Sequence, residues 1–173
     1  MIGKCYWITG LSATGKTTYS KLLANHFRSN GRKVVLLDGD ELRQVFASET
    51  YSREERIALG MRYSRLCQLI SSQGIDVIIA VIGLFKEIQT WNRENIPHYI
   101  EIFIDTSIDE LVKRDPKKLY RKYNNGEIRN VAGLDLKVDY PQKPDIYIEW
   151  SSQRSIESMF EELLIKCNNI EKK

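Results

Sequence analysis

Short apolar runs alternate along the chain with longer stretches in which apolar residues recur every three or four positions. This alternation is typical of strand–helix units on a parallel sheet. The short runs predict strands at residues 4–9, 33–37, 76–82, 98–104 and 145–149. The longer stretches predict helices at residues 15–30, 41–47, 53–73, 85–93, 108–114 and 155–166. Several short runs are apolar throughout, as strands covered on both faces tend to be, so we expect an α/β fold with a parallel sheet.

Residues 115–144 break this pattern, because they are basic, contain three prolines and an Asn-Asn-Gly, and show weak periodicity. A segment of this kind in a compact domain is usually either disordered or a functional lid, and we interpret it as a lid. The whole chain, residues 1–173, has the length of a single domain.

Composition excludes several classes of function. The 26 Lys and Arg exceed the 23 Asp and Glu by only three, too few to predict a nucleic-acid or membrane partner. The three cysteines are widely separated and lack the spacing of a zinc site or disulfide framework, which favours a reducing compartment. No apolar run is long enough to span a bilayer, and the N-terminus lacks a signal-peptide core. We therefore expect a cytoplasmic protein whose function must be inferred from motifs.

The strongest motif is G-L-S-A-T-G-K-T at residues 10–17, which fits G-x-x-x-x-G-K-[ST] and lies between a predicted strand and a predicted helix. In such a loop the backbone N–H groups and the helix N-terminus bind phosphate oxygens. Lys16 should reach the β- and γ-phosphates, and the Thr17 hydroxyl should bind Mg²⁺. The predicted ATP-binding residues here are Gly10, Leu11, Ser12, Ala13, Thr14, Gly15, Lys16, Thr17 and Thr18.

A second motif, D-G-D-E-L-R at residues 38–43, follows the second predicted strand at the sheet edge where the phosphate loop must also lie. Phosphoryl transfer to an alcohol needs a group that orients or deprotonates the hydroxyl, and an anionic group that helps to hold Mg²⁺. We predict that Asp38 and Asp40 are catalytic together with Lys16, that Asp38 shares the metal with Thr17, and that Arg43 binds an anionic acceptor. The alternative is a solvated turn in which Asp40 caps the following helix.

With these motifs the sequence resembles the adenylylsulfate kinase family of P-loop kinases, which phosphorylates the ribose 3′-hydroxyl of adenylylsulfate with MgATP. The resemblance implies a three-layer fold with a five-stranded parallel sheet. It also implies that Arg114 packs near the donor adenine and that the basic segment closes as a lid over both nucleotides. The matching segments are GLSATGKTT (10–18), LDGDELR (37–43), SREER (52–56), RDPKKLYRKYNNGEIRNVAGLD (114–135), Pro141 and Pro144.

Departures from the family pattern concentrate on the acceptor side. Glu41 replaces the asparagine of D-G-D-N, and only Arg62 remains of an E-N-I-R-R stretch. The serine and proline of an I-S-P loop are missing at residues 83–84. Val131 stands where the family's N-F-T-G has a phenylalanine that stacks on the acceptor adenine. Base–aromatic stacking contributes about 1–3 kcal/mol, so its loss is large enough to change the preferred nucleotide.

The leading hypothesis is an ATP-dependent, Mg²⁺-requiring kinase that phosphorylates the ribose 3′-hydroxyl of a nucleoside 5′-phosphoric anhydride. The changes on the acceptor side are compatible with a smaller pyrimidine base, and the resemblance to a family member that acts on cytidine 5′-diphosphoramidate in bacterial capsule modification implies that acceptor. The alternatives are adenylylsulfate of sulfate assimilation, a non-catalytic nucleotide-binding module, and a small-metabolite kinase such as a sugar-acid kinase. Because related kinases are often dimers, a homodimer is possible. The predicted acceptor-binding residues are Asp40, Arg43, Arg56, Phe85, Lys117 and Val131, with Arg62 a weaker candidate.

Overall fold

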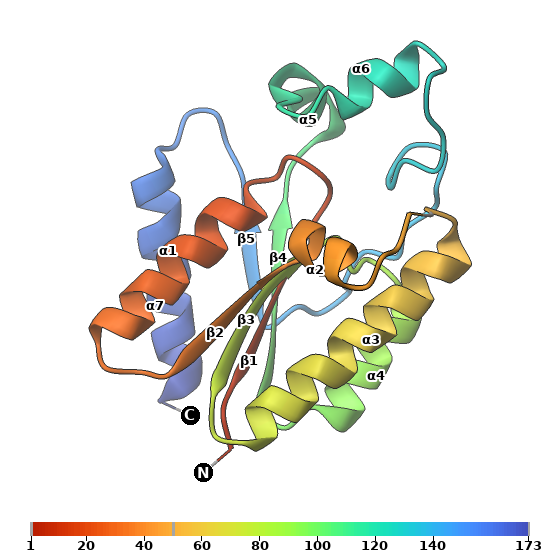
Figure 1. Ribbon diagram of the computed structural model, residues 1–173. Helices are drawn as coiled ribbons and strands as arrows, with labels where there is room; N and C mark the ends of the chain where they lie inside the picture. Colours follow the sequence, from red (N-terminus) through yellow and green to blue (C-terminus); the bar gives the residue numbers. More distant parts are fainter. Residues whose placement is uncertain (1, 50, 173) are drawn as a thin grey trace.

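The computed structural model describes residues 2–49 and 51–172, and a parallel five-stranded sheet forms its centre (Figure 1). The strand order is β2-β3-β1-β4-β5. Because every strand pair is parallel, the carboxyl ends of all five strands lie at one edge. This confirms the predicted fold class. The strands are β1 (Cys5–Thr9), β2 (Val34–Asp38), β3 (Asp76–Val81), β4 (Tyr99–Asp105) and β5 (Ile146–Glu149).

Helices cover both faces of the sheet and give the molecule three layers (Figure 1). One face carries α1 (Lys16–Ser29) and α7 (Ile156–Glu171), and the other carries α3 (Arg53–Ser72) and α4 (Lys86–Asn95). Side chains of a strand alternate between faces. Tyr6 accordingly belongs to the core beneath α1 and α7, whereas Trp7 belongs to the core beneath α3 and α4. Within the described chain, no helix has the length and apolar character needed to cross a membrane.

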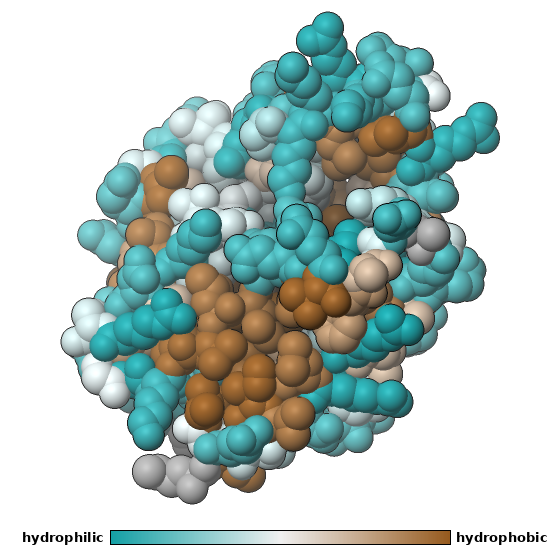
Figure 2. All heavy atoms as spheres, in the orientation of Figure 1, coloured by the Kyte–Doolittle hydropathy of each residue, from teal (hydrophilic) through white to brown (hydrophobic). Residues whose placement is uncertain are grey.

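Strand β2 lies at an edge of the sheet and is only half-buried along its length. Figure 2 shows an apolar area between α1 and α3, where Figure 1 places this strand. An uncovered edge strand can pair with another chain. The homodimer nevertheless stays a prediction.

The start of helix α2 (Gly39–Val45) corrects one alternative left open by the sequence. Asp38, not Asp40, is the N-cap, and its carboxylate accepts the backbone N–H of Asp40 at 2.9 Å. The helix therefore begins two residues before the predicted start at residue 41. A side-chain oxygen at this position satisfies one of the free N–H groups of the first turn. The cap fixes the Asp38 carboxylate at the carboxyl end of β2.

The segment 115–144 is more ordered than its weak periodicity indicated. It contains helix α6 (Leu119–Asn124), which was not predicted and which follows α5 (Ile108–Arg114) above the carboxyl ends of the strands (Figure 1). Its buried apolar side chains join the main core, so the segment is packed against the domain. These side chains are Tyr120, Val131, Ala132 and Leu136.

A polar cluster closes the opposite, amino-terminal end of the sheet. The guanidinium of Arg32 lies 2.7 Å from the carboxylate of Asp76 and 2.8 Å from that of Glu171, and it donates to the Tyr6 hydroxyl at 3.0 Å. Its carbon is 3.8 Å from the centre of the Phe27 ring. One side chain thus links β3, α1 and the last turn of α7, which extends five residues beyond the predicted end at residue 166.

Candidate active site

A cavity of about 810 Å³ opens at the carboxyl ends of the strands, between the phosphate loop, α2, α3, the loop after β3 and the segment 115–144. Nearly all of the predicted site residues line this cavity, although they come from five separate parts of the chain. Gly10, Leu11 and Thr14 do not line it. The predicted residues that do are Ser12, Ala13, Gly15, Lys16, Thr17, Thr18, Asp38, Asp40, Arg43, Arg56, Phe85, Arg114, Lys117 and Val131.

The phosphate loop curls around Lys16 at the amino end of α1. The Lys16 ammonium donates to the carbonyl of Leu11 at 2.5 Å, and the buried Thr14 hydroxyl donates to the same carbonyl at 3.1 Å. Leu11 itself is buried in the core, so Leu11 and Thr14 shape the loop and their side chains do not face the cavity. Burial, and second the nearby charge of Lys117, lower the pKa of Lys16 to about 8. The charges of Asp40 and Asp38 offset only part of this effect, so a phosphate group would add stabilising negative charge beside Lys16.

Thr17 and Asp38 meet at the floor of the cavity. The Thr17 hydroxyl donates to one oxygen of the Asp38 carboxylate at 2.7 Å, while the other oxygen accepts from the α2 backbone. Magnesium takes oxygen ligands, commonly one or two carboxylates with the rest from water and phosphate. The described chain has no cluster of three or more His, Cys, Asp or Glu that could hold a metal by itself. The pair fits a magnesium ion that also binds the phosphates of ATP.

Asp40 reaches a different partner, the ammonium of Lys117 in the segment 115–144, with which it forms an ion pair. The two side chains are 68% and 61% exposed, so the pair contributes little to stability. Its importance is positional, because it holds a lysine of the segment 115–144 beside Asp40, the carboxylate that was predicted to lie on the acceptor side.

Two predicted arginines converge on Tyr51, which the sequence did not indicate. The guanidinium carbons of Arg43 and Arg56 lie 4.3 and 5.2 Å from the centre of its ring. Arg56 also donates to the carbonyl of Asn130 at 3.0 Å, which ties α3 to the segment 115–144. Burial, and second the charge of Arg43, lower the pKa of Arg56 to about 10. Arg62, the weaker candidate, is exposed on α3 and does not line the cavity.

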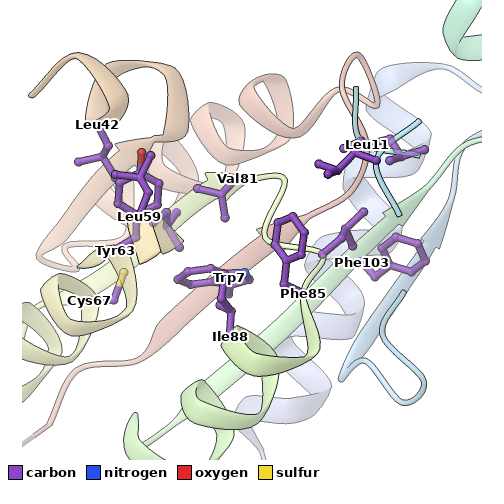
Figure 3. Packing of buried hydrophobic residues seen from close by; sticks show 14 of the residues in the cluster. Trp7, Leu11, Leu42, Leu59, Tyr63, Cys67, Val81, Phe85, Ile88 and Phe103 are labelled. Atoms are coloured by element: carbon purple, nitrogen blue, oxygen red, sulfur yellow. The ribbon is translucent and has the colours of Figure 1, made fainter. Parts of the chain in front are cut away.

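Opposite the charged groups the cavity has an apolar wall. Figure 3 shows the buried cluster behind this wall, in which Phe85, Val81 and Ile88 lie around the indole of Trp7. Phe85 and Val131 are each only 2% exposed, so Phe85 packs in the core and presents little of its ring to the cavity. Phe85 is therefore a core residue at the edge of the cavity, and its contact with the acceptor base stays a prediction.

Two glycines account for departures from the family pattern. A Cβ on Gly83, which has a left-handed φ of +49°, would lie 2.9 Å from the indole nitrogen of Trp7. A Cβ on Gly60 would lie 2.2 Å from the end of the Ile88 side chain. A serine at residue 83 would therefore be strained and crowded. With glycine at these two positions, the loop after β3 lies close against Trp7 and helix α3 lies close against Ile88, so larger residues would not fit there.

Comparison with known proteins decides the family. The family model described as Adenylylsulphate kinase matches residues 2–149. The chain belongs to the adenylylsulfate kinase family. It is 37% identical over 160 residues to the cytidine diphosphoramidate kinase of Campylobacter jejuni, covering 92% of this chain and 93% of that protein. It is also 37% identical over 150 residues to the adenylyl-sulfate kinase of Pseudomonas aeruginosa, covering 85% and 76%.

The solved structures agree with this assignment. The APS kinase of Mycobacterium tuberculosis, in complex with AMPPNP and APS, superposes with a TM-score of 0.88 at 30% identity, covering 96% of this chain and 98% of that one. The resemblance inferred from the motifs is confirmed, and the protein is a kinase.

Residues outside the predicted site set also line or support the cavity of this adenylylsulfate-kinase-family member. Leu59, Gly60 and Tyr63 line the cavity from α3. Leu59 and Gly60 follow Arg56 by three and four residues, and Tyr63 follows them by four and three, so these spacings put them on the helix face of Arg56 and were the available signal. Tyr120 is buried beneath the cavity, and its hydroxyl donates to the carbonyl of Ser12 at 3.1 Å. No sequence signal linked Tyr120 to the phosphate loop.

Proposed function

We propose that this kinase transfers the γ-phosphoryl group of ATP to the ribose 3′-hydroxyl of a nucleoside 5′-phosphoric anhydride, and that cytidine 5′-diphosphoramidate is its acceptor. The observation that carries the proposal is the contrast between the two halves of the cavity. The phosphate-binding half has the complete family motif, whereas the acceptor half has Val131 and Gly83 at positions where the family pattern has phenylalanine and serine.

On the donor side, Lys16 and the loop amides bind the triphosphate, and Arg114 packs against the adenine. Thr17 and Asp38, whose oxygens are 2.7 Å apart, would hold Mg²⁺, which neutralises charge on the β- and γ-phosphates when bound. Lys16 is half-buried, and the charges of Asp40 and Asp38 only partly offset the effect of burial and of Lys117 on its pKa, so an anionic phosphate would stabilise its charged form. This arrangement favours ATP binding over a merely structural loop.

The chemistry that follows is a direct in-line transfer. The 3′-oxygen forms a bond to the γ-phosphorus while the bond between that phosphorus and the β–γ bridging oxygen breaks. Asp38 orients the hydroxyl and accepts its proton, and the leaving group is ADP. Its carboxylate is suited to this because the helix cap and Thr17 fix its position. The serine after β3 is replaced by Gly83, so a phosphoserine intermediate at that position is excluded.

On the acceptor side, Arg43, Arg56 and Lys117 supply positive charge for the 5′-anhydride, with Asp40 positioning Lys117. Val131 is buried at the edge of the cavity, so the base lacks the aromatic platform that a phenylalanine would supply. A pyrimidine depends less than adenine on a broad aromatic platform, because its ring system is smaller. The Campylobacter jejuni relative, named a cytidine diphosphoramidate kinase, is covered over 93% of its length and supports the same acceptor.

Adenylylsulfate is the second candidate, since the Pseudomonas aeruginosa relative named for that substrate is equally identical over a slightly shorter match. The test gives the purified kinase MgATP with either acceptor and measures kcat/KM for each. The proposal expects a higher value with cytidine 5′-diphosphoramidate. A higher value with adenylylsulfate would overturn the choice of acceptor. Lys16→Ala serves as the control, because turnover with any acceptor should disappear while the melting temperature of the fold persists.

A further inference from the structure

Trp150 lies directly after β5, next to a residue of the donor side. The guanidinium carbon of Arg114, the last residue of α5, is 4.5 Å from the centre of the Trp150 ring. Arg114 lines the cavity and Trp150 does not. The arginine therefore lies between the tryptophan and the space where a nucleotide would bind.

Trp150 is held firmly enough to serve as a support. Its ring is half-buried and packs against the core that contains Tyr19 and Ile104. Its backbone N–H donates to the carbonyl of Asp105 at 2.8 Å, which ties the residue to the end of β4. The indole is thus fixed by both its side chain and its main chain.

Arg114 lacks comparable fixation. It is exposed at the end of a short helix, and across residues 2–49 and 51–172 no hydrogen bond or ion pair holds its guanidinium. A free arginine side chain samples many rotamers, and restricting them for a ligand costs free energy. A planar guanidinium stacks well on an aromatic face, so the contact with Trp150 reduces that cost before the nucleotide arrives.

We infer that Trp150 is a positioning residue for the donor base: it holds Arg114 flat, so that the outer face of the guanidinium stacks on the base of ATP. The inference rests on the proposed ATP site but not on the identity of the acceptor. The triphosphate is bound elsewhere, by the loop around Lys16. Loss of Trp150 should therefore weaken recognition of the base and leave recognition of the phosphates intact.

The test measures binding by calorimetry without acceptor, with MgATP and with inorganic tripolyphosphate as probes. Trp150→Leu keeps an apolar side chain but removes the aromatic face, and it should raise the Kd for MgATP about three- to tenfold while leaving that for tripolyphosphate unchanged. Trp150→Phe should restore MgATP affinity to within about twofold of the parent. Trp91→Leu is the matched control, because Trp91 is also half-buried but lies on α4 outside this cavity.

Combining Trp150→Leu with Arg114→Ala should weaken binding no more than Arg114→Ala alone, because the tryptophan acts through the arginine. In turnover, Trp150→Leu should raise KM for ATP and leave kcat and the acceptor KM unchanged. Equal loss of MgATP and tripolyphosphate affinity, or no loss of either, would overturn the inference. Failure of the parent protein to bind MgATP would instead overturn the proposed donor site.

Discussion

The most direct consequence of the phosphate-loop geometry is that ATP affinity depends on the protonation of Lys16. Burial lowers the pKa of this lysine from its ordinary 10.5 to about 8, with a second contribution from Lys117. A difference of that size corresponds to about 3 kcal/mol that disfavours the charged form in the free protein. Bound phosphates add negative charge beside the ammonium and raise its pKa again.

The direction of the pH dependence follows, because proton binding to Lys16 and binding of MgATP favour each other. Below pH 8 Lys16 is already protonated, so MgATP binds without further proton uptake and its Kd is nearly constant. Above pH 8 the free protein loses the proton, and binding must recover it. The Kd should therefore rise about tenfold between pH 7 and pH 9, approaching a tenfold change per pH unit beyond.

The assay is calorimetry of MgATP without acceptor between pH 7 and pH 9.5, repeated in two buffers of different ionisation enthalpy. Proton uptake should be near zero at pH 7 and approach one proton per ATP at pH 9. Lys16→Met should bind more weakly at every pH and lose this part of the pH dependence. A Kd that stays constant to pH 9.5 in the parent protein would refute the argument, because it would mean that Lys16 keeps its charge or does not contact the phosphates.

Three further changes test other parts of the structure. Arg32→Met keeps an apolar stem over Phe27 but removes both ion pairs, and it should lower the free energy of unfolding by about 2–4 kcal/mol in urea titrations with kcat unchanged. Val131→Phe should raise kcat/KM for adenylylsulfate by about tenfold or more through stacking, measured beside the cytidine acceptor. Tyr120→Phe removes the hydrogen bond to the carbonyl of Ser12, and it should lower the free energy of unfolding by about 1 kcal/mol and raise KM for ATP.

For each of the three variants, one specific result would contradict the expectation. Unchanged urea stability in the Arg32 variant would mean that α7 is held by its apolar face alone. A Val131 variant that gains nothing with adenylylsulfate would show that the base lies elsewhere in the cavity. Normal ATP kinetics in the Tyr120 variant would show that the phosphate loop keeps its shape without the segment 115–144.

The parts of the fold that could be predicted are those specified by local patterns. Buried strands such as β3 read as continuous apolar runs, and the glycine–lysine loop requires a strand before it and a helix after it. Helix α6 escaped prediction because it has six residues, too few to show a helical period. The cap by Asp38 also escaped prediction, because one aspartate stands on each side of Gly39 and only the backbone geometry distinguishes them.

The site could be predicted where one segment supplies it and not where several segments meet. Lys16 and Thr17 come from one loop, so their roles follow from spacing. Tyr51 lies in the loop before α3 and contributes through contacts with Arg43 and Arg56, which depend on how α2 and α3 pack. Pairings of that kind are tertiary, and a motif in one segment carries no information about them.

The same distinction explains why the departures from the family pattern fall on the acceptor side. Triphosphate is bound mainly by backbone N–H groups of a tight loop, whose path requires its glycines and leaves little freedom of sequence. In the proposed site the acceptor would be surrounded by side chains from α3, the loop after β3 and the segment 115–144, and each of these can change separately. In this kinase Gly83 lets the loop close on Trp7, and Gly60 lets Ile88 approach α3. Phenylalanine at residue 131 alone would then be insufficient to make the pocket fully suited to adenylylsulfate, so full conversion should also require changes at residues 60 and 83.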